Sequence, residues 1–193
     1  LTTGVAPLAN PPWEWSETKN VKWKVKLPGF GTSTPIIWGD RVFILTAVPS
    51  GKKVEAKPSE TPVAVPASPN PGEGRRPPGG GFGRAEKPTE AYQFTVLCLD
   101  RKTGKTLWQK VAREEVPHEG HHKDHGFASA SPVTDGKHLL AYFGSRGLYC
   151  FDLDGNLKWE KDFGDMQTKN SFGEGSSPAL FGNTVVVVWD HDG

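Results

Sequence analysis

Three things are scarce or missing in this sequence of 193 residues: cysteine, an excess of charge of either sign, and long apolar runs. The two cysteines, Cys98 and Cys150, are far fewer than a small disulfide-stapled domain needs. The 23 basic residues are balanced by 22 acidic ones, so no net field attracts nucleic acid or an anionic membrane surface. No apolar run approaches the roughly 18 residues of a membrane-spanning helix. A disulfide scaffold, a nucleic-acid partner and a membrane span are therefore not expected.

A repeated four-stranded unit is the strongest pattern that the sequence does contain. Its clearest copy runs from Ser131 to Phe163, where two Asp-Gly pairs and a turn at Gly144–Gly147 separate four apolar or alternating runs. Asp-Gly pairs favour tight hairpins because they tolerate positive φ. The unit is therefore predicted to be a four-stranded antiparallel meander.

Parts of this unit recur on both sides of the complete copy. A Ser/Thr-Pro pair is followed by a turn glycine and a β-rich run at Pro35–Gly39, Pro132–Gly136 and Pro178–Gly182. Repeated four-stranded units of this size are typical of β-propeller blades. The predicted fold is all-β, a partial β-propeller of about two and a half blades. Blade one is expected at 35–111, blade two at 131–163 and the start of blade three at 177–193.

Blade one is interrupted by the segment 49–91, which holds nine of the 17 prolines and few large apolar residues. Such a composition cannot build a core, so the segment is predicted to be a disordered excursion between the second and third strands of the blade. Without it about 150 residues remain, whereas closed propellers have about four to eight blades. We therefore expect residues 1–193 to form an incomplete propeller domain, whose partners are the remaining blades or another protein.

Two copies of a short motif carry a resemblance to a known family. The run Cys98-Leu-Asp-Arg-Lys-Thr-Gly-Lys-Thr-Leu-Trp108 resembles the tryptophan-docking repeat of quinoprotein propellers, A-x-D-x-x-T-G-K-x-x-W, with cysteine for the first alanine. The run Cys150 to Trp159 resembles it with one residue fewer, and Val21–Trp23 is similar to the end of a further copy. The resemblance implies that each tryptophan packs between neighbouring blades near the glycine turn. The structural motif residues are Asp100, Gly104 and Trp108, and Asp152, Gly155 and Trp159.

The sequence outside the insert is also similar to the pyrroloquinoline-quinone-like (PQQ-like) propellers that are abundant in planctomycetes and to the repeats of outer-membrane-assembly lipoproteins. Phrases such as Thr34–Phe43, Gly147–Gly155 and Trp189–Gly193 carry this likeness. Such proteins are usually exported, so the resemblance implies a periplasmic or secreted location. Residues 1–12 lack the basic start and apolar stretch of a signal peptide, and we expect one to precede them.

The resemblance leaves two functions open. One is a non-catalytic binding or scaffold module of an exported bacterial protein, which recognises a partner through loops and blade edges. The alternative is a fragment of an alcohol or sugar dehydrogenase that uses pyrroloquinoline quinone with calcium in the full-length protein. Enzymes of that class often carry an adjacent Cys-Cys pair, which this sequence lacks, and no catalytic or cofactor-binding residue can be singled out. We favour the binding module, since a fold does not fix a function.

The segment His118–His125 is the densest group of candidate metal ligands. It contains H-E-x-x-H, but Pro117 and Gly120 oppose the helix on which that motif binds zinc, so a metallopeptidase is not expected. One interpretation is that its histidines and Asp124 bind a transition metal or line a ligand pocket. The interpretation that we favour is a polar surface loop with solvated histidines. The four histidines are His118, His121, His122 and His125.

Two further groups of residues are given structural interpretations. Cys98 and Cys150 occupy equivalent positions on successive blades, too far apart for a disulfide, and are predicted to be separate buried thiols. Arg146 and the segment 169–174 are interpreted as turn residues, not as contacts to a substrate.

Overall fold

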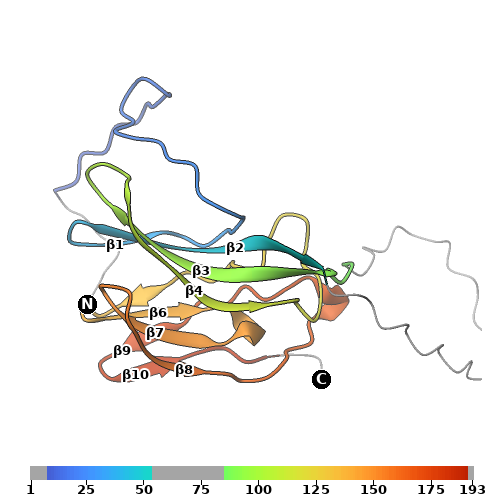
Figure 1. Ribbon diagram of the computed structural model, residues 1–193. Helices are drawn as coiled ribbons and strands as arrows, with labels where there is room; N and C mark the ends of the chain where they lie inside the picture. The colour runs from blue at the N-terminus through green and yellow to red at the C-terminus, as the bar shows by residue number, and fades with distance from the viewer. Residues whose placement is uncertain (1–7, 54–84, 191–193) are drawn as a thin grey trace, which may run out of the picture.

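The computed structural model describes residues 8–53 and 85–190, and in these ranges the chain is built almost entirely of antiparallel strands (Figure 1). The first sheet contains β1 (Ile36–Trp38), β2 (Arg41–Lys53), β3 (Glu90–Asp100) and β4 (Thr106–Glu115), in that order. The second contains β5 (Val133–Thr134), β6 (His138–Tyr142), β7 (Leu148–Asp152) and β8 (Leu157–Lys161), in that order. The hairpin of β9 (Ala179–Phe181) and β10 (Thr184–Val186) follows. Two four-stranded meanders and one hairpin confirm the predicted all-β partial propeller.

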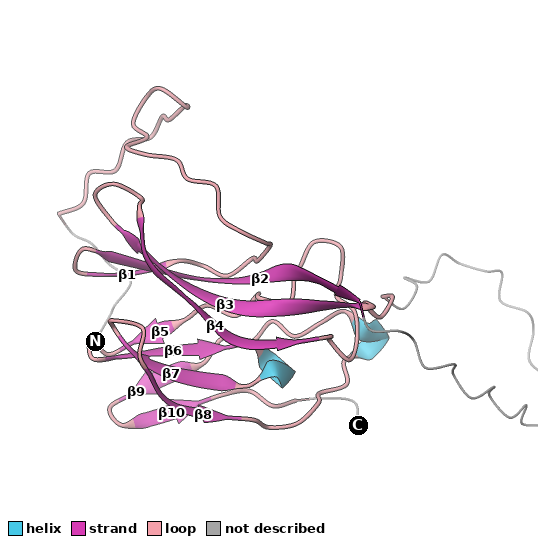
Figure 2. Cartoon of the chain, viewed as in Figure 1, coloured by secondary structure: helices cyan, strands magenta, loops and turns pink. Residues whose placement is uncertain are grey.

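Helix contributes only two short 3-10 turns, η1 (Gly144–Arg146) and η2 (Lys169–Ser171), drawn in cyan in Figure 2. Within the described ranges, no helix is long and apolar enough to span a membrane. The two sheets and the hairpin lie one above another, and each contacts its neighbour through its face (Figures 1 and 2).

The insert in the first sheet begins later and ends earlier than the sequence analysis expected. Strand β2 continues through Pro49 to Lys53, and Lys53 pairs with Glu90 at the start of β3. Pro49 is tolerated because β1 pairs only with residues 41–43 of β2, which leaves one side of β2 open at the proline. The ends of the predicted 49–91 segment are therefore strand, and its middle part, 54–84, lies outside the described residues.

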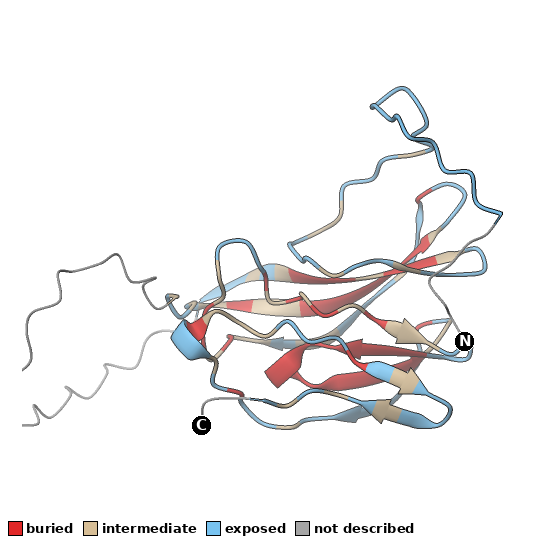
Figure 3. Cartoon of the chain, turned by 180° about the vertical axis from the view of Figure 1, so that it is seen from behind, coloured by how far each residue is buried: buried red, intermediate tan, exposed pale blue. Residues whose placement is uncertain are grey.

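The two inner strands of the second sheet, β6 and β7, are buried on both faces, because they lie between the first sheet and the β9–β10 hairpin. Leu139, Ala141 and Phe143 alternate with Leu140 and Tyr142 along the chain. The first set packs against β2 and β3, and the second packs toward β9 and β10. Figure 3 shows the inner strands of this sheet coloured as buried. Successive strand residues point to opposite faces, so a sheet covered on both sides needs apolar residues at every position. This explains the unbroken apolar runs of β6 and β7.

The two ends of the stacked sheets differ in the length of their connections. Short turns join β1 to β2, β3 to β4, β5 to β6, β7 to β8 and β9 to β10 at one end. The opposite end carries the residues 116–132 between the two sheets, the η1 turn at 143–147, and the residues 162–178 that lead to β9. We call this end the long-loop face and the other the short-turn face. Because long connections of a rigid scaffold are common binding surfaces, the long-loop face is the first place to look for a site.

Candidate functional site

On the short-turn face, Trp108 of β4 reaches from the first sheet to the second. Its indole Nε1–H donates a hydrogen bond to the Leu153 carbonyl at 3.0 Å, and its ring packs near Phe43 with centroids 5.9 Å apart. Gly155 lies directly beneath the ring: a Cβ at this position would lie 2.9 Å from Trp108 Cδ2. Gly155 also has φ of +83°, which side chains rarely adopt. Glycine at position 155 therefore allows both the positive φ of the turn and the close contact with the Trp108 indole.

Trp23 makes the corresponding contacts with the turn of the first sheet, although residues 21–23 belong to no strand. Its Nε1–H donates to the Arg101 carbonyl at 2.9 Å, and its ring lies 2.6 Å from a Cβ built on Gly104. Trp23 of the segment Val21–Trp23 therefore contacts a glycine turn and a backbone carbonyl in the same way as Trp108.

The two motif aspartates shape the turns under these rings. Asp100 Oδ1 accepts hydrogen bonds from the Thr103 hydroxyl and the Thr103 amide, each at 2.7 Å, and these bonds lower the pKa of Asp100. Asp152 accepts from Lys158 Nζ at 2.8 Å and from Asn156 at 2.9 Å, and these contacts lower its pKa as well. Each aspartate closes its own turn, as short acceptor side chains commonly do.

Trp159 differs from what its position in the motif implies. Trp159 is 43% exposed, so within the described chain it is not the counterpart of Trp108. In the neighbouring β5–β6 turn, burial would raise the pKa of Asp135, but hydrogen bonds from the His138 backbone and imidazole outweigh it and lower the pKa to about 2.

Both cysteines are free, buried thiols, as predicted. Cys98 belongs to the core between the first and second sheets, and Cys150 to the core between the second sheet and the hairpin. Burial raises the pKa of Cys98 to about 11 and also raises the pKa of Cys150. Neither has the exposed, electropositive surroundings of a reactive thiol.

On the long-loop face, the four histidines of 118–125 do not converge. His121 Nδ1–H donates to the His122 carbonyl at 2.8 Å, and the His121 ring packs against Phe127. His122 lies with its ring 6.0 Å from that of His125 and near Phe172, whereas His118 lies apart in an ionic cluster. In the ranges that the structure describes, no group of three ligating residues includes His121, His122 or His125.

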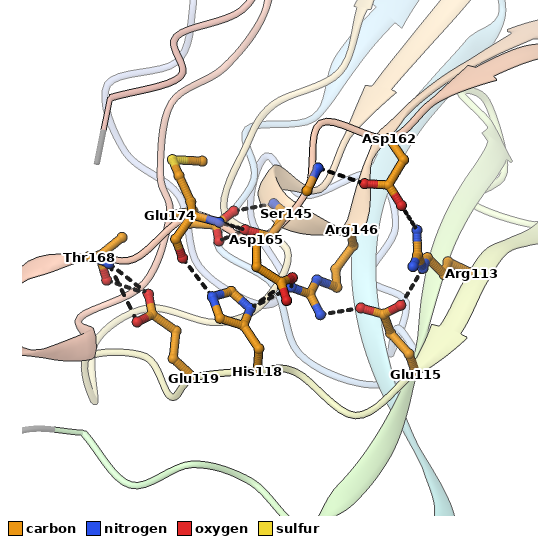
Figure 4. Close-up of polar contacts among 12 residues, drawn as sticks. Arg113, Glu115, His118, Glu119, Ser145, Arg146, Asp162, Asp165, Thr168 and Glu174 are labelled. Atoms are coloured by element: carbon orange, nitrogen blue, oxygen red, sulfur yellow. Dashed lines mark hydrogen bonds and ion pairs between the residues drawn. The ribbon is translucent and has the colours of Figure 1, made fainter. Parts of the chain in front are cut away.

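The ionic cluster is centred on Arg146, which is only 5% exposed (Figure 4). Its guanidinium pairs with Glu115, lies 2.7 Å from Asp165 Oδ1, and donates to His118 Nδ1 at 2.5 Å. Arg113 pairs in turn with Glu115 and with Asp162. The sequence predicts the turn that contains Arg146. It does not predict the buried contacts of Arg146, because their partners lie more than 15 residues away in the sequence.

Two carboxyl groups of the cluster are satisfied by neutral donors instead. Glu119 is 7% exposed, and its Oε1 accepts from the Thr168 hydroxyl at 2.5 Å and the Thr168 amide at 3.2 Å. Glu174 accepts from the amide and the hydroxyl of Ser145. Burial raises the pKa of Glu174, and the hydrogen bonds from Ser145 oppose that shift only in part.

A hollow of about 250 Å³ opens beside this cluster on the long-loop face. Its wall contains the aromatic ring of Tyr142, the hydroxyls of Thr168 and Ser176, and the carboxyls of Glu174 and Asp190. Among the residues that the structure describes, no lysine or arginine lines it. The arrangement can accept hydrogen bonds and positive charge.

Comparison with known protein families gives a match over the C-terminal half of the chain. The profile of the family described as outer membrane protein assembly factor BamB, a PQQ-like repeat family, matches residues 93–193. No curated protein matches the chain. The matched half contains β3 and β4, the whole second sheet and the β9–β10 hairpin, which are the parts whose stacked meanders show the repeat. The chain therefore belongs to the PQQ-like repeat family described as outer membrane protein assembly factor BamB.

Proposed function

We propose that the chain is a non-catalytic binding module of an exported bacterial protein, and that it recognises a partner protein through the long-loop face. One observation carries the proposal: the two long described connections between strands, 116–132 and 162–178, lie at this end, while five short turns between strands occupy the other. Membership of a family described as an assembly factor supports protein binding, and the family's description also supports a periplasmic, outer-membrane-associated location. Further blades or a second protein would complete the propeller.

The partner we expect presents a lysine or arginine side chain to the hollow. Glu174 and Asp190 supply negative charge there, and Tyr142 supplies an aromatic wall. A cationic side chain placed against carboxylates and an aromatic ring gains both ionic and cation–π attraction. The role of the motif residues would be structural: Trp23 and Trp108 hold successive sheets in position on the opposite, short-turn face.

The residues of the hollow do not fit pyrroloquinoline quinone. That cofactor is a flat, strongly anionic quinone, and a pocket for it should offer cationic groups to its carboxylates. The hollow offers two carboxyls and no basic side chain, so it would repel the cofactor. No catalytic step is derived through a quinone.

The test is to select peptide binders to the chain from a random library and to locate them with two blocking variants. Ser176→Trp fills the hollow, and Lys137→Trp places an equal ring on the short-turn face; both positions are exposed. We expect binders to contain lysine or arginine, and binding to be lost in Ser176→Trp and kept in Lys137→Trp. Peptides that bind Ser176→Trp as well as they bind the parent chain would overturn the proposal that the partner binds at the hollow. Dye-linked alcohol or sugar oxidation after addition of pyrroloquinoline quinone and calcium would favour the dehydrogenase.

A further inference from the structure

His118, Glu119 and Glu174 form a cluster whose ligand atoms all lie within 4.8 Å of one another. His118 and Glu119 follow β4, whereas Glu174 precedes β9, so the fold brings together residues from two different connections (Figure 4). We propose that these three side chains bind one divalent transition-metal ion, with zinc the first choice and manganese the second. The site shares Glu174 with the wall of the hollow, whereas His118 and Glu119 lie outside that wall.

The geometry of the cluster suits a single small ion. Zinc binds imidazole nitrogen and carboxylate oxygen at about 2.0–2.2 Å, so its ligands lie about 3.4 Å apart in a tetrahedral site. The three side chains would have to close by at most about 1.4 Å from their present separations. They also line a common cavity of about 30 Å³, which is large enough for one water-sized occupant. One imidazole with two carboxylates favours zinc or manganese over calcium, which prefers oxygen ligands alone.

The surroundings of His118 determine which ring nitrogen can bind the ion. Nδ1 faces Arg146 and Asp165, while Nε2 lies 2.5 Å from the Met166 carbonyl oxygen on the side of Glu174 (Figure 4). In the structure Arg146 donates to Nδ1, so Nε2–H donates to the Met166 carbonyl. Binding at Nε2 therefore requires this proton to move to Nδ1 and the Arg146 guanidinium to turn away from Nδ1. Asp165 Oδ1, 3.4 Å from Nδ1, is placed to accept that proton's hydrogen bond. A carboxylate behind a ligating histidine is the usual support of such ligands.

The charge balance of the cluster provides a separate argument for a cation. Two guanidinium groups lie among five carboxyl groups, those of Glu115, Glu119, Asp162, Asp165 and Glu174. The arginines pair with Glu115, Asp162 and Asp165. For Glu119 and Glu174, no lysine or arginine nitrogen of residues 8–53 or 85–190 lies within 4.0 Å. Arg146 acts on Glu174 electrostatically without a direct ion pair. A divalent ion would place positive charge in contact with both carboxyls.

The experiment is titration of the chelator-treated chain with zinc by calorimetry and with manganese by electron paramagnetic resonance. We expect one ion per chain. Glu119→Gln and Glu174→Gln keep an oxygen that accepts from Thr168 or Ser145 but remove the ligating charge, so each should weaken binding at least tenfold. His125→Gln is the matched control, because His125 is an exposed histidine of the same loop and should bind as the parent does. The metal-free circular dichroism spectrum verifies that each variant is folded.

A second measurement needs no variant. In the unaltered chain, zinc should shift the nitrogen resonance of His118 Nε2 and leave those of His122 and His125 unchanged. Unchanged affinity in both glutamine variants, loss of binding in His125→Gln, or a shift at His122 or His125 without one at His118 would each overturn the proposal. Failure of the parent chain to bind either ion at millimolar concentration would overturn it too.

Discussion

Replacing Trp108 by alanine tests whether its indole links the first sheet to the second. The substitution removes packing against the core at Phe43 and the hydrogen bond to the Leu153 carbonyl. Truncation of a buried aromatic residue costs about 3–5 kcal/mol, and because Trp108 is only partly buried we expect a value near the lower end, about 3 kcal/mol. Trp108→Phe keeps a ring but loses the donor, and should cost about 1–2 kcal/mol.

Trp159→Ala is the matched comparison, because both tryptophans occupy the same position of the motif. Trp159 lies on an exposed strand and is 43% exposed, so its loss should cost about 1 kcal/mol. The assay is urea denaturation followed by far-ultraviolet circular dichroism, with the free energy of unfolding compared among the three variants and the parent. Equal costs for Trp108→Ala and Trp159→Ala, or a cost for Trp108→Ala close to zero, would refute the linking role.

Three other predictions concern the turns and the cores. Gly155→Ala should lower the free energy of unfolding by more than Gly164→Ala, because both glycines have positive φ but only Gly155 has a ring against it; equal losses by urea denaturation would contradict this. Cys98 and Cys150 should not react with a thiol reagent near pH 8 until the chain unfolds, and rapid labelling of the native chain would show that a core is open. Asp135 has a lowered pKa, so its contribution to stability is present above about pH 4 and is lost as the pH falls toward 2. Asp135→Asn should therefore make thermal unfolding less sensitive to pH in that window, and an unchanged slope would contradict the assignment.

The strands could be predicted from the sequence because local signals specify them. The Asp-Gly pairs at 135–136 and 154–155 mark hairpin turns, and the apolar runs beside them mark strands that are covered on both faces. The repeat then gives the order of the strands, since each meander pairs neighbours along the chain. The boundaries of the insert were wrong because the pairing of Lys53 with Glu90 depends on the partner strand and not on local composition.

The cluster on the long-loop face could be predicted only in part. His118 and Glu119 belong to a conspicuous histidine-rich run, but the run itself does not reveal that its other three histidines point elsewhere. Glu174 lies 55 positions after Glu119, and only the stacking of the second sheet against the hairpin brings the two connections together. The exposure of Trp159 likewise depends on what lies against β8, which the motif does not encode.

Hydrogen exchange of the chain with and without a selected peptide binder tests the central claim most directly, because it shows which backbone amides a partner covers. The account predicts that protection appears in residues 116–132 and 162–178, on the long-loop face, and is absent from the turns at 135–137 and 153–156. Protection of those turns without protection of the long loops would contradict the proposal that this chain binds through its long-loop face.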